Sequence, residues 1–204
     1  GHTSGVPNFN ELPGFSPDLT PLQSIALAAK QPLQFPPGSD WAYSNTNYTI
    51  LGVIAESLTG MPWSTLLDER FFEPLSLTDT YVFTGEPQAP TIIGSRLDCG
   101  FPNEPECVKR PGFSLIPVTN GFDWVVAWSA GAIVSTPSDM AKWIKALTTG
   151  EVLNTAHTQL MMTASPQSRR VLSEQPTYGT MRWTGCGLGL LEYEFEFEFE
   201  FEFE

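Results

Sequence analysis

The sequence predicts a fold of the α+β class, made mostly of helices and loops with few strands. Apolar residues recur at helical spacing in several segments, and capping residues or glycines mark where those segments begin and end. The 18 prolines and 17 glycines among 204 residues indicate extensive loops between the helices. A strict period of two, the pattern of a strand, runs through the last residues. We therefore expect the strands to lie mainly in the last third of the chain.

Five segments carry a helical pattern. They cover residues 17–29, 46–59, 62–72 and 136–147, with a fifth helix beginning near residue 154. The fourth has a strong start, since Thr136 can cap it, Pro137 fits its first position and Asp139 its first turn. Residues 81–122 lack such periodicity, and one short strand is expected there, near 114–118. A connection of that length inside one domain is often functional.

The stretch from Phe35 to Leu58 organises the rest of the chain. Pro36-Pro37-Gly38 is a stiff turn, and Tyr43-Ser44-Asn45 stands just ahead of an apolar helical run. Short polar residues are typical there, because the first N–H groups of a helix lack partners. Taken alone, these residues indicate a capped helix beside a packed aromatic. The apolar residues that follow at helical spacing are Ile50, Leu51, Ile54, Ala55 and Leu58.

Charge and composition exclude several classes of function. The net charge is −13, but seven glutamates lie in the last thirteen residues, and removing them from the count leaves −6. A chain with that balance and no basic stripe is not expected to bind nucleic acid. No apolar run approaches the roughly 18 residues of a membrane span, so no membrane span is expected.

The three cysteines leave two possibilities open. Cys99 and Cys107 flank a loop and could form a disulfide or remain two free thiols, and Cys186 is distant in sequence. The cysteines and the two histidines lie at no zinc-ligand spacing, so no metal site is expected. A glycosylation sequon at residues 47–49 and the potential disulfide favour a secreted or extracytoplasmic location. The sequence does not decide the location.

Several motifs together resemble one family. The pattern PG-x-x-W-x-YSN, followed by a helix ending in Thr-Gly, resembles the second motif of the penicillin-recognising serine hydrolases, in the branch of class C β-lactamases, DD-peptidases and esterases. Further segments agree in order: residues 2–5 (HTSG), 72–75 (FEPL) with 78–80 (TDT), and 130–139 (AGAIVSTPSD). The resemblance runs from residue 2 to about 190. It implies a β-lactamase/DD-peptidase-like fold, mainly the helical lobe with part of the α/β lobe.

The resemblance also assigns roles at the second motif. Tyr43 would be the phenol that exchanges a proton with the nucleophile and the leaving group. Asn45 would hydrogen-bond the amide of the substrate, and Ser44 would serve the backbone turn. Because an unperturbed phenol titrates near 10, the role of Tyr43 needs a cation close by. The family has a Gly-rich strand near residues 185–189, so we reject a nucleotide loop there and expect no cofactor.

Two of the three motifs of the family are missing. The nucleophilic serine and its lysine belong to a Ser-x-x-Lys motif, and no serine stands three residues before any lysine of this chain. The third motif, Lys-Thr-Gly or His-x-Gly, would follow residue 190, where a Glu-Phe repeat stands instead. We therefore expect an incomplete piece of a serine acyl hydrolase that is inactive alone. The alternatives are a non-catalytic binding module of the same fold and an assembly driven by the tail.

The chain divides into two parts on this view. Residues 1–190 form a partial hydrolase domain, whose whole protein would act on a small-molecule or peptide acyl substrate: a β-lactam, a D-amino-acid peptide or an ester. Residues 191–204 form a low-complexity tail in which Glu and Phe alternate. Repeats of GAATTC, the EcoRI site, read in frame as Glu-Phe, so concatenated cloning linkers explain the tail; a natural end or a deliberate tag are alternatives. As a strand it would carry phenylalanines on one face and could associate with copies of itself.

Overall fold

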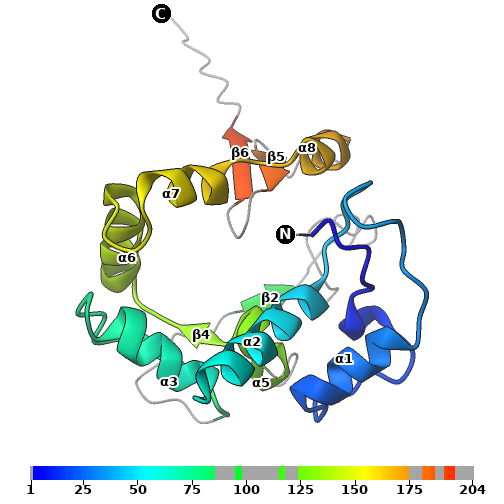
Figure 1. Cartoon of the computed structure of the whole chain (residues 1–204), viewed down its shortest axis with the longest axis horizontal. Helices are drawn as coiled ribbons and strands as arrows, with labels where there is room; N and C mark the ends of the chain where they lie inside the picture. The colour runs from blue at the N-terminus through cyan, green and yellow to red at the C-terminus, as the bar shows by residue number, and fades with distance from the viewer. Residues whose placement is uncertain are drawn as a thin grey trace, which may run out of the picture.

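The elements follow one another around a ring in the computed structural model, which describes residues 2–85, 95–97, 115–117, 124–174, 181–186 and 191–195 (Figure 1). The α-helices are α1 (Pro21–Ala29), α2 (Asn45–Thr59), α3 (Trp63–Leu67), α5 (Trp124–Ala127), α6 (Pro137–Thr149), α7 (Thr155–Met162) and α8 (Pro166–Ser173). Short helices of other types are η1 (Phe9–Glu11), η2 (Asp68–Phe72) and η3 (Trp128–Ala130). The fold is mostly helical with little sheet, as the sequence predicts.

The strands pair in three small antiparallel sheets within the described part of the chain. β1 (Tyr81–Val82) pairs with β4 (Ile133–Val134), β2 (Ser95–Leu97) with β3 (Leu115–Pro117), and β5 (Met181–Cys186) with β6 (Leu191–Phe195). The strand expected near residues 114–118 is present as β3. The expectation that strands lie mainly in the last third holds only for the two longest, β5 and β6, because the other four come earlier.

Helix α2 packs through small and polar residues instead of its apolar face. Its buried residues are Thr46, Thr49 and Gly52, whereas Leu51, Ile54 and Leu58 are 54%, 46% and 82% exposed. The apolar residues at helical spacing therefore do not form the buried face of α2. The reason is close approach: a Cβ on Gly52 would lie 2.3 Å from the Oγ of Ser129 in η3. The side of α2 that meets α1 and η3 must be small, and the apolar side remains uncovered by the described residues.

Small residues also form the buried face of helix α1. Thr20 caps it in a capping box with Gln23, and its buried residues are Ser24 and Ala28. The apolar residues Leu22, Ile25, Ala26 and Ala29 are thus not its buried face, and Leu22 is 66% exposed. Contact with α2 and η1 selects small residues here as well.

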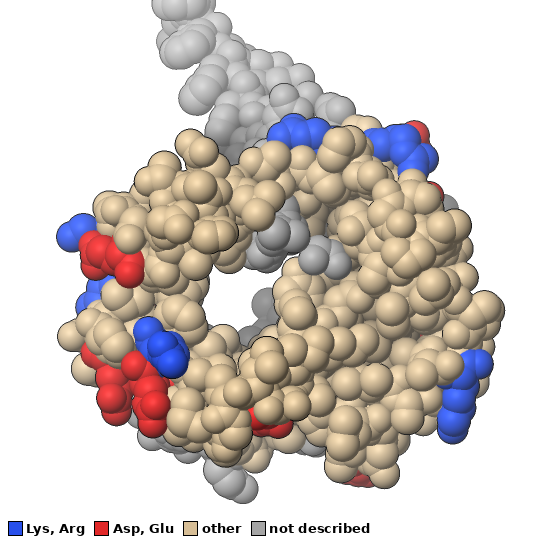
Figure 2. Space-filling model, in the orientation of Figure 1, with Lys and Arg blue, Asp and Glu red and all other residues tan. Residues whose placement is uncertain are grey.

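The ring closes where the C-terminal elements meet the segment before α2. Trp41 forms a buried cluster with Leu172 of α8 and Cys186 of β5. Arg170 of α8 forms an ion pair with Asp40, with 2.6 Å between Nη2 and Oδ1. Residues more than 120 positions apart in the sequence therefore lie side by side next to the Tyr-Ser-Asn stretch. The space-filling view shows an opening at the centre of the ring (Figure 2).

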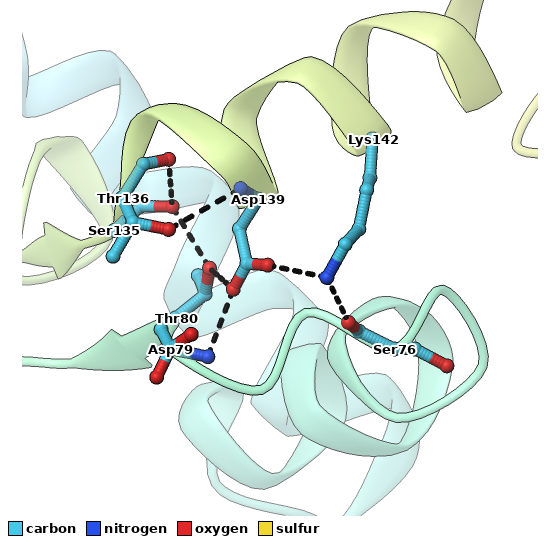
Figure 3. A network of polar contacts seen from close by, with 7 residues as sticks. All are labelled: Ser76, Asp79, Thr80, Ser135, Thr136, Asp139 and Lys142. Atoms are coloured by element: carbon cyan, nitrogen blue, oxygen red, sulfur yellow. Dashed lines mark hydrogen bonds and ion pairs between the residues drawn. The ribbon is translucent and has the colours of Figure 1, made fainter.

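The N-terminus of α6 is fixed by a buried carboxylate (Figure 3). Asp139, 1% exposed, accepts hydrogen bonds from the backbone N–H of Asp79 (2.8 Å) and the Oγ1 of Thr80 (3.0 Å). Its Oδ1 lies 2.7 Å from the Nζ of Lys142, which also donates to the carbonyl oxygen of Ser76. This network joins the turn after η2 to α6, so two segments that the sequence motifs single out meet here.

The described residues show how basic side chains, long apolar helices and metal-ligating groups are distributed. On the face shown in Figure 2, Lys and Arg side chains lie in separate small groups and form no continuous basic stripe. Among the described helices none alone is long and apolar enough to cross a membrane; only α2 taken with α3 and η2, bent by 82° between them, meets the length and composition test. No group of three metal-ligating side chains comes together in the described residues.

Candidate active site

Tyr43 stands at the entrance to α2 with its side chain 47% exposed. Ser44 follows as the residue before the first turn, in an extended conformation (φ −152°, ψ 113°), and Asn45 begins the helix. No hydrogen bond joins the side chains of Tyr43 and Asn45. The two predicted site residues are therefore close because they are two positions apart in the sequence, and each has different partners.

Asn45 is held by the N-terminal loop. Its backbone N–H donates to Oδ1 of Asn8 (3.0 Å), and its side-chain Nδ2 donates to Oδ1 of Asn10 (3.1 Å). Asn8 is itself buried and donates to Glu11. A side chain from another segment thus caps α2, and it orients the amide of Asn45 so that Oδ1 is left without a partner among the described residues.

Ser44 does not perform the capping role expected of it. Its Oγ is fully buried and has no hydrogen-bond partner in the described residues. Its backbone N–H donates instead to Nδ1 of His2, over 3.1 Å. The prediction that Ser44 serves the turn is therefore correct for the backbone only.

The loop that resembles the HTSG motif runs beside the segment before Tyr43. The N–H of Gly38 donates to the carbonyl of Thr3 (2.7 Å), and the N–H of Ala42 donates to the carbonyl of His2 (3.0 Å). Gly5 is required by geometry: its φ is +75°, and a Cβ there would lie 2.1 Å from the carbonyl oxygen of Phe35. Two of the resembling motifs thus form one structural unit.

Aromatic rings surround His2, which is 5% exposed. Its ring centre lies 4.4 Å from that of Tyr43, 5.2 Å from that of Tyr48 and 5.6 Å from that of Trp41. Burial, helped by the positive N-terminus, lowers the pKa of His2 to about 4. The imidazole is therefore neutral at pH 7.

Tyr43 is a protonated phenol in this environment. Burial, and secondarily the neighbouring Cys186 thiol when ionised, raises the pKa of Tyr43 above its ordinary value of 10. The same two causes raise the pKa of Tyr48. None of the described side chains that contact His2 or pack beside Tyr43 carries an ammonium or guanidinium that could stabilise a phenolate. At neutral pH the phenol can donate a proton but cannot accept one.

Cys186 lies against the same cluster. The thiol is buried, and burial raises the pKa of Cys186. Ser168 fixes the strand at this point, since its Oγ accepts from the N–H of Cys186 (2.9 Å) and donates to its carbonyl (3.0 Å). Cys99 and Cys107, the possible disulfide, lie outside the described residues. The sequon residue Asn47 has a buried Nδ2, so this fold does not present it for glycosylation.

Sequence reasoning missed three residues of the site. Asn8 and Asn10 belong to no recognised pattern, and only the fold brings them to Asn45. His2 carried a signal, because it opens the HTSG segment, but its contact with Tyr43 depends on a turn more than thirty residues away. These contacts required the structure.

The fold and the site define a class of protein, the β-lactamases and penicillin-binding proteins. A sequence model described as "Beta-lactamase" matches residues 1–191. Because this match covers most of the chain, the protein belongs to the beta-lactamase family, the serine hydrolases that include β-lactamases and DD-peptidases.

Individual relatives agree with this assignment. A putative D-alanyl-D-alanine carboxypeptidase of Escherichia coli strain K12 is 40% identical over 58 residues, which are 28% of this chain and 13% of that protein. A protein of the same description from Salmonella schwarzengrund is 39% identical over 57 residues, with the same shares covered. The matched segments are therefore a small part of these curated relatives.

Solved structures match over nearly the whole chain. The D-amino acid amidase of Ochrobactrum anthropi SV3, complexed with L-phenylalanine amide, superimposes with a TM-score of 0.69 and 27% identity, covering 93% of this chain and 51% of that one. A D-stereospecific amidohydrolase of Streptomyces gives 0.68 and 26%, covering 93% and 54%. A penicillin binding protein of Bacillus halodurans gives 0.58 and 25%, covering 80% and 48%. The chain spans about half the length of these three structures.

Proposed function

We propose that the whole protein is a serine acyl hydrolase and that residues 1–190 supply the Tyr43–Asn45 part of its active site. The observation that carries this proposal is the half-exposed phenol of Tyr43 at the start of α2, beside an amide whose oxygen is unoccupied. A phenol and an amide that face solvent from one rigid helix start are suited to proton transfer and to substrate orientation. The roles given to these residues are thus compatible with their surroundings.

Asn45 binds the substrate through its free carbonyl oxygen in this proposal. Its Nδ2 is engaged by Asn10, which fixes the plane of the amide, and Oδ1 can then accept an N–H of an amide substrate. Tyr43 exchanges a proton with the nucleophile and the leaving group. For that step its pKa must fall, which requires a cation outside the described cluster.

The nucleophile lies outside residues 1–204 in this account, so the chain as it stands does not turn over substrate. No Ser-x-x-Lys and no Lys-Thr-Gly or His-x-Gly is present in the sequence. Loss of the nucleophile alone costs several orders of magnitude in rate in serine hydrolases. The raised pKa of Tyr43 supports this, because a phenol without its cation cannot act as a base.

The substrate class we propose is a small amide or peptide of a D-amino acid. Three relatives support it: a putative D-alanyl-D-alanine carboxypeptidase, a D-amino acid amidase and a D-stereospecific amidohydrolase. β-Lactams and simple esters are the alternatives, because one fold and motif set serves all these chemistries.

The test uses the protein encoded by the gene together with its flanking sequence. We expect it to contain a Ser-x-x-Lys and to hydrolyse D-phenylalanine amide faster than the L-amide. Replacing Tyr43 with Phe should lower kcat by about a hundredfold or more, the usual contribution of an acid–base group, with little change in KM. The matched control is Tyr81→Phe in β1. Full activity in Y43F would remove the role given to Tyr43, whereas an open reading frame without the nucleophile motif would favour a non-catalytic binding module.

Self-association through residues 191–204 is a second candidate function, favoured by one observation. Residues 191–195 already form β6, which pairs only with β5 in the described sheets and so offers a free edge. The Glu-Phe alternation continues in the sequence to residue 204. Sedimentation at pH 7 and pH 5 tests it: association should rise as carboxylates lose charge, and a chain ending at Leu190, which lacks β6 and the repeat, should remain monomeric at both values.

A further inference from the structure

We propose that His2 is a positioning residue for Tyr43, holding the backbone on both sides of it and packing on its ring. The inference rests on the proposed function, since it gives His2 a role that acts through the phenol of Tyr43. Its physical content, a neutral imidazole that determines where Tyr43 lies, is measurable in this chain without any catalysis.

Three contacts place His2 around Tyr43. The carbonyl oxygen of His2 accepts the N–H of Ala42, the residue before Tyr43, over 3.0 Å. The Nδ1 of His2 accepts the N–H of Ser44, the residue after Tyr43, over 3.1 Å. Between these two hydrogen bonds the imidazole packs on the ring of Tyr43, with centres 4.4 Å apart and planes tilted by 34°. One residue thus fixes both flanking peptides and the side chain itself.

The packing of His2 supports a Tyr43 side chain that has no hydrogen bond of its own in the described residues. The hydroxyl of Tyr43 has no hydrogen-bond partner in the described residues, and half of the side chain is exposed. Without external support, a side chain of that kind samples several rotamers. The imidazole packs on the ring of Tyr43, and it is itself held by ring contacts with Tyr48 and Trp41. The position of the phenol therefore depends on that of His2.

The proton state of His2 is defined by geometry. A backbone N–H can only donate, so Nδ1 of His2 must carry a free lone pair and the proton must be on Nε2. Burial favours the same neutral state. The ring contacts of His2 in the described residues are with Tyr43, Tyr48 and Trp41, and none of these is an anion at neutral pH that would stabilise an imidazolium. Protonation would break the hydrogen bond from Ser44.

Two substitutions separate the contacts. His2→Asn keeps an acceptor at the position of Nδ1 but removes the ring, whereas His2→Phe keeps a ring but removes the acceptor. Hydrogen exchange at the Ser44 amide reports the hydrogen bond. An alkaline absorbance titration, taken as the difference between each chain and its Tyr43→Phe counterpart, isolates the phenol of Tyr43 among five tyrosines. His157→Asn, on the exposed side of α7, is the matched control.

Each of the two variants should change one of these measurements and leave the other unchanged. In H2F the Ser44 amide should exchange about five- to tenfold faster, the equivalent of one hydrogen bond, while the titration of Tyr43 stays where it is. In H2N the Ser44 amide should keep its protection, while the Tyr43 phenol titrates at lower pH because water reaches its ring. H157N should match the unaltered chain in both measurements.

Contrary outcomes are equally specific. Unchanged Ser44 exchange in H2F would overturn the role of Nδ1, and an unchanged Tyr43 titration in H2N would overturn the role of the ring. If a variant does not fold, the unaltered chain still decides: its ¹⁵N spectrum at pH 6 must show His2 with Nδ1 unprotonated, and a protonated Nδ1 would overturn the proposal. A whole protein without hydrolase activity would refute the proposed function and leave these results unaffected.

Discussion

Two polar clusters in this molecule are built on opposite principles. Around Asp139 a buried charge is fully satisfied: a backbone N–H, a hydroxyl and the ammonium of Lys142 converge on one carboxylate (Figure 3). Around Tyr43 the phenol and the imidazole of His2 are neutral at pH 7, and a polar atom is left over. Ser44 Oγ is buried without a hydrogen-bond partner in the described residues, and the side chain of Tyr43 is 47% exposed.

The paired network at Asp139 stabilises the fold, whereas the Tyr43 cluster binds a ligand on the proposed function. A buried polar network in which every group is paired is rigid and joins segments, as Asp139 joins the turn after η2 to α6. Buried polar groups without partners are rare in folded proteins, and each calls for an explanation. On the proposed function, the explanation for the Tyr43 cluster is that substrate and further catalytic groups complete the site.

Breaking the Asp139 network should produce the largest loss of stability. In Asp139→Asn the ammonium of Lys142 loses its counter-charge, and an NH₂ group takes the place of one acceptor oxygen. We expect the free energy of unfolding, measured in urea, to fall more than for any other substitution named here. Tyr43→Phe removes a hydroxyl without a partner and should stay within about 0.5 kcal/mol of the unaltered chain.

Asp18→Asn, on an exposed loop, is the control for the loss of one negative charge. If Y43F proved as destabilising as D139N, the two clusters would not differ in the way described, and the phenol would be part of the structural core.

Acid should affect the two clusters in different pH ranges, and this effect is smaller. The pKa of His2 is about 4 in the folded chain and 6.5 as an ordinary histidine, so the unfolded chain binds more protons between these values. The stability that neutral His2 contributes is complete above pH 6.5 and is lost as the pH falls through 4, by at most about 3 kcal/mol. The Lys142 hydrogen bond lowers the pKa of Asp139, so that network is lost only at lower pH.

Urea unfolding at pH 7, 6 and 5 measures this dependence. The H2N variant should lose most of it, and the exposed-histidine variant H157N should keep it. A chain whose stability did not change between pH 7 and pH 5 would indicate that His2 is not buried in solution.

The sequence predicted helix positions better than helix faces. The capping residues Thr136 and Gly60 mark real ends, because the unpaired N–H and C=O groups at helix termini select residue types locally. The buried faces of α1 and α2 could not be predicted, since apolar spacing does not reveal that neighbouring segments approach closely enough to require Ser24 or Gly52. Helix α8 was missed because its short sequence is mostly polar and buries little beyond Ser168 and Leu172.

The site was predictable as a motif and not as a set of contacts. Tyr43 and Asn45 follow from a local pattern whose chemistry is readable residue by residue. Their partners His2, Asn8 and Asn10 come from a segment that reaches them only through the turn at Pro36-Pro37-Gly38 and the backbone pairing beyond it. Pairing between distant segments depends on the whole chain, and no short pattern encodes it.

We propose that this chain carries the Tyr43 part of a hydrolase site and no nucleophile. Mass spectrometry of the intact chain after incubation with a fluorescent penicillin at pH 7 tests it most directly, with a penicillin-binding protein as the positive control. We expect an unchanged mass for the chain and a covalent adduct for the control. An adduct on any serine of residues 1–204 would contradict it.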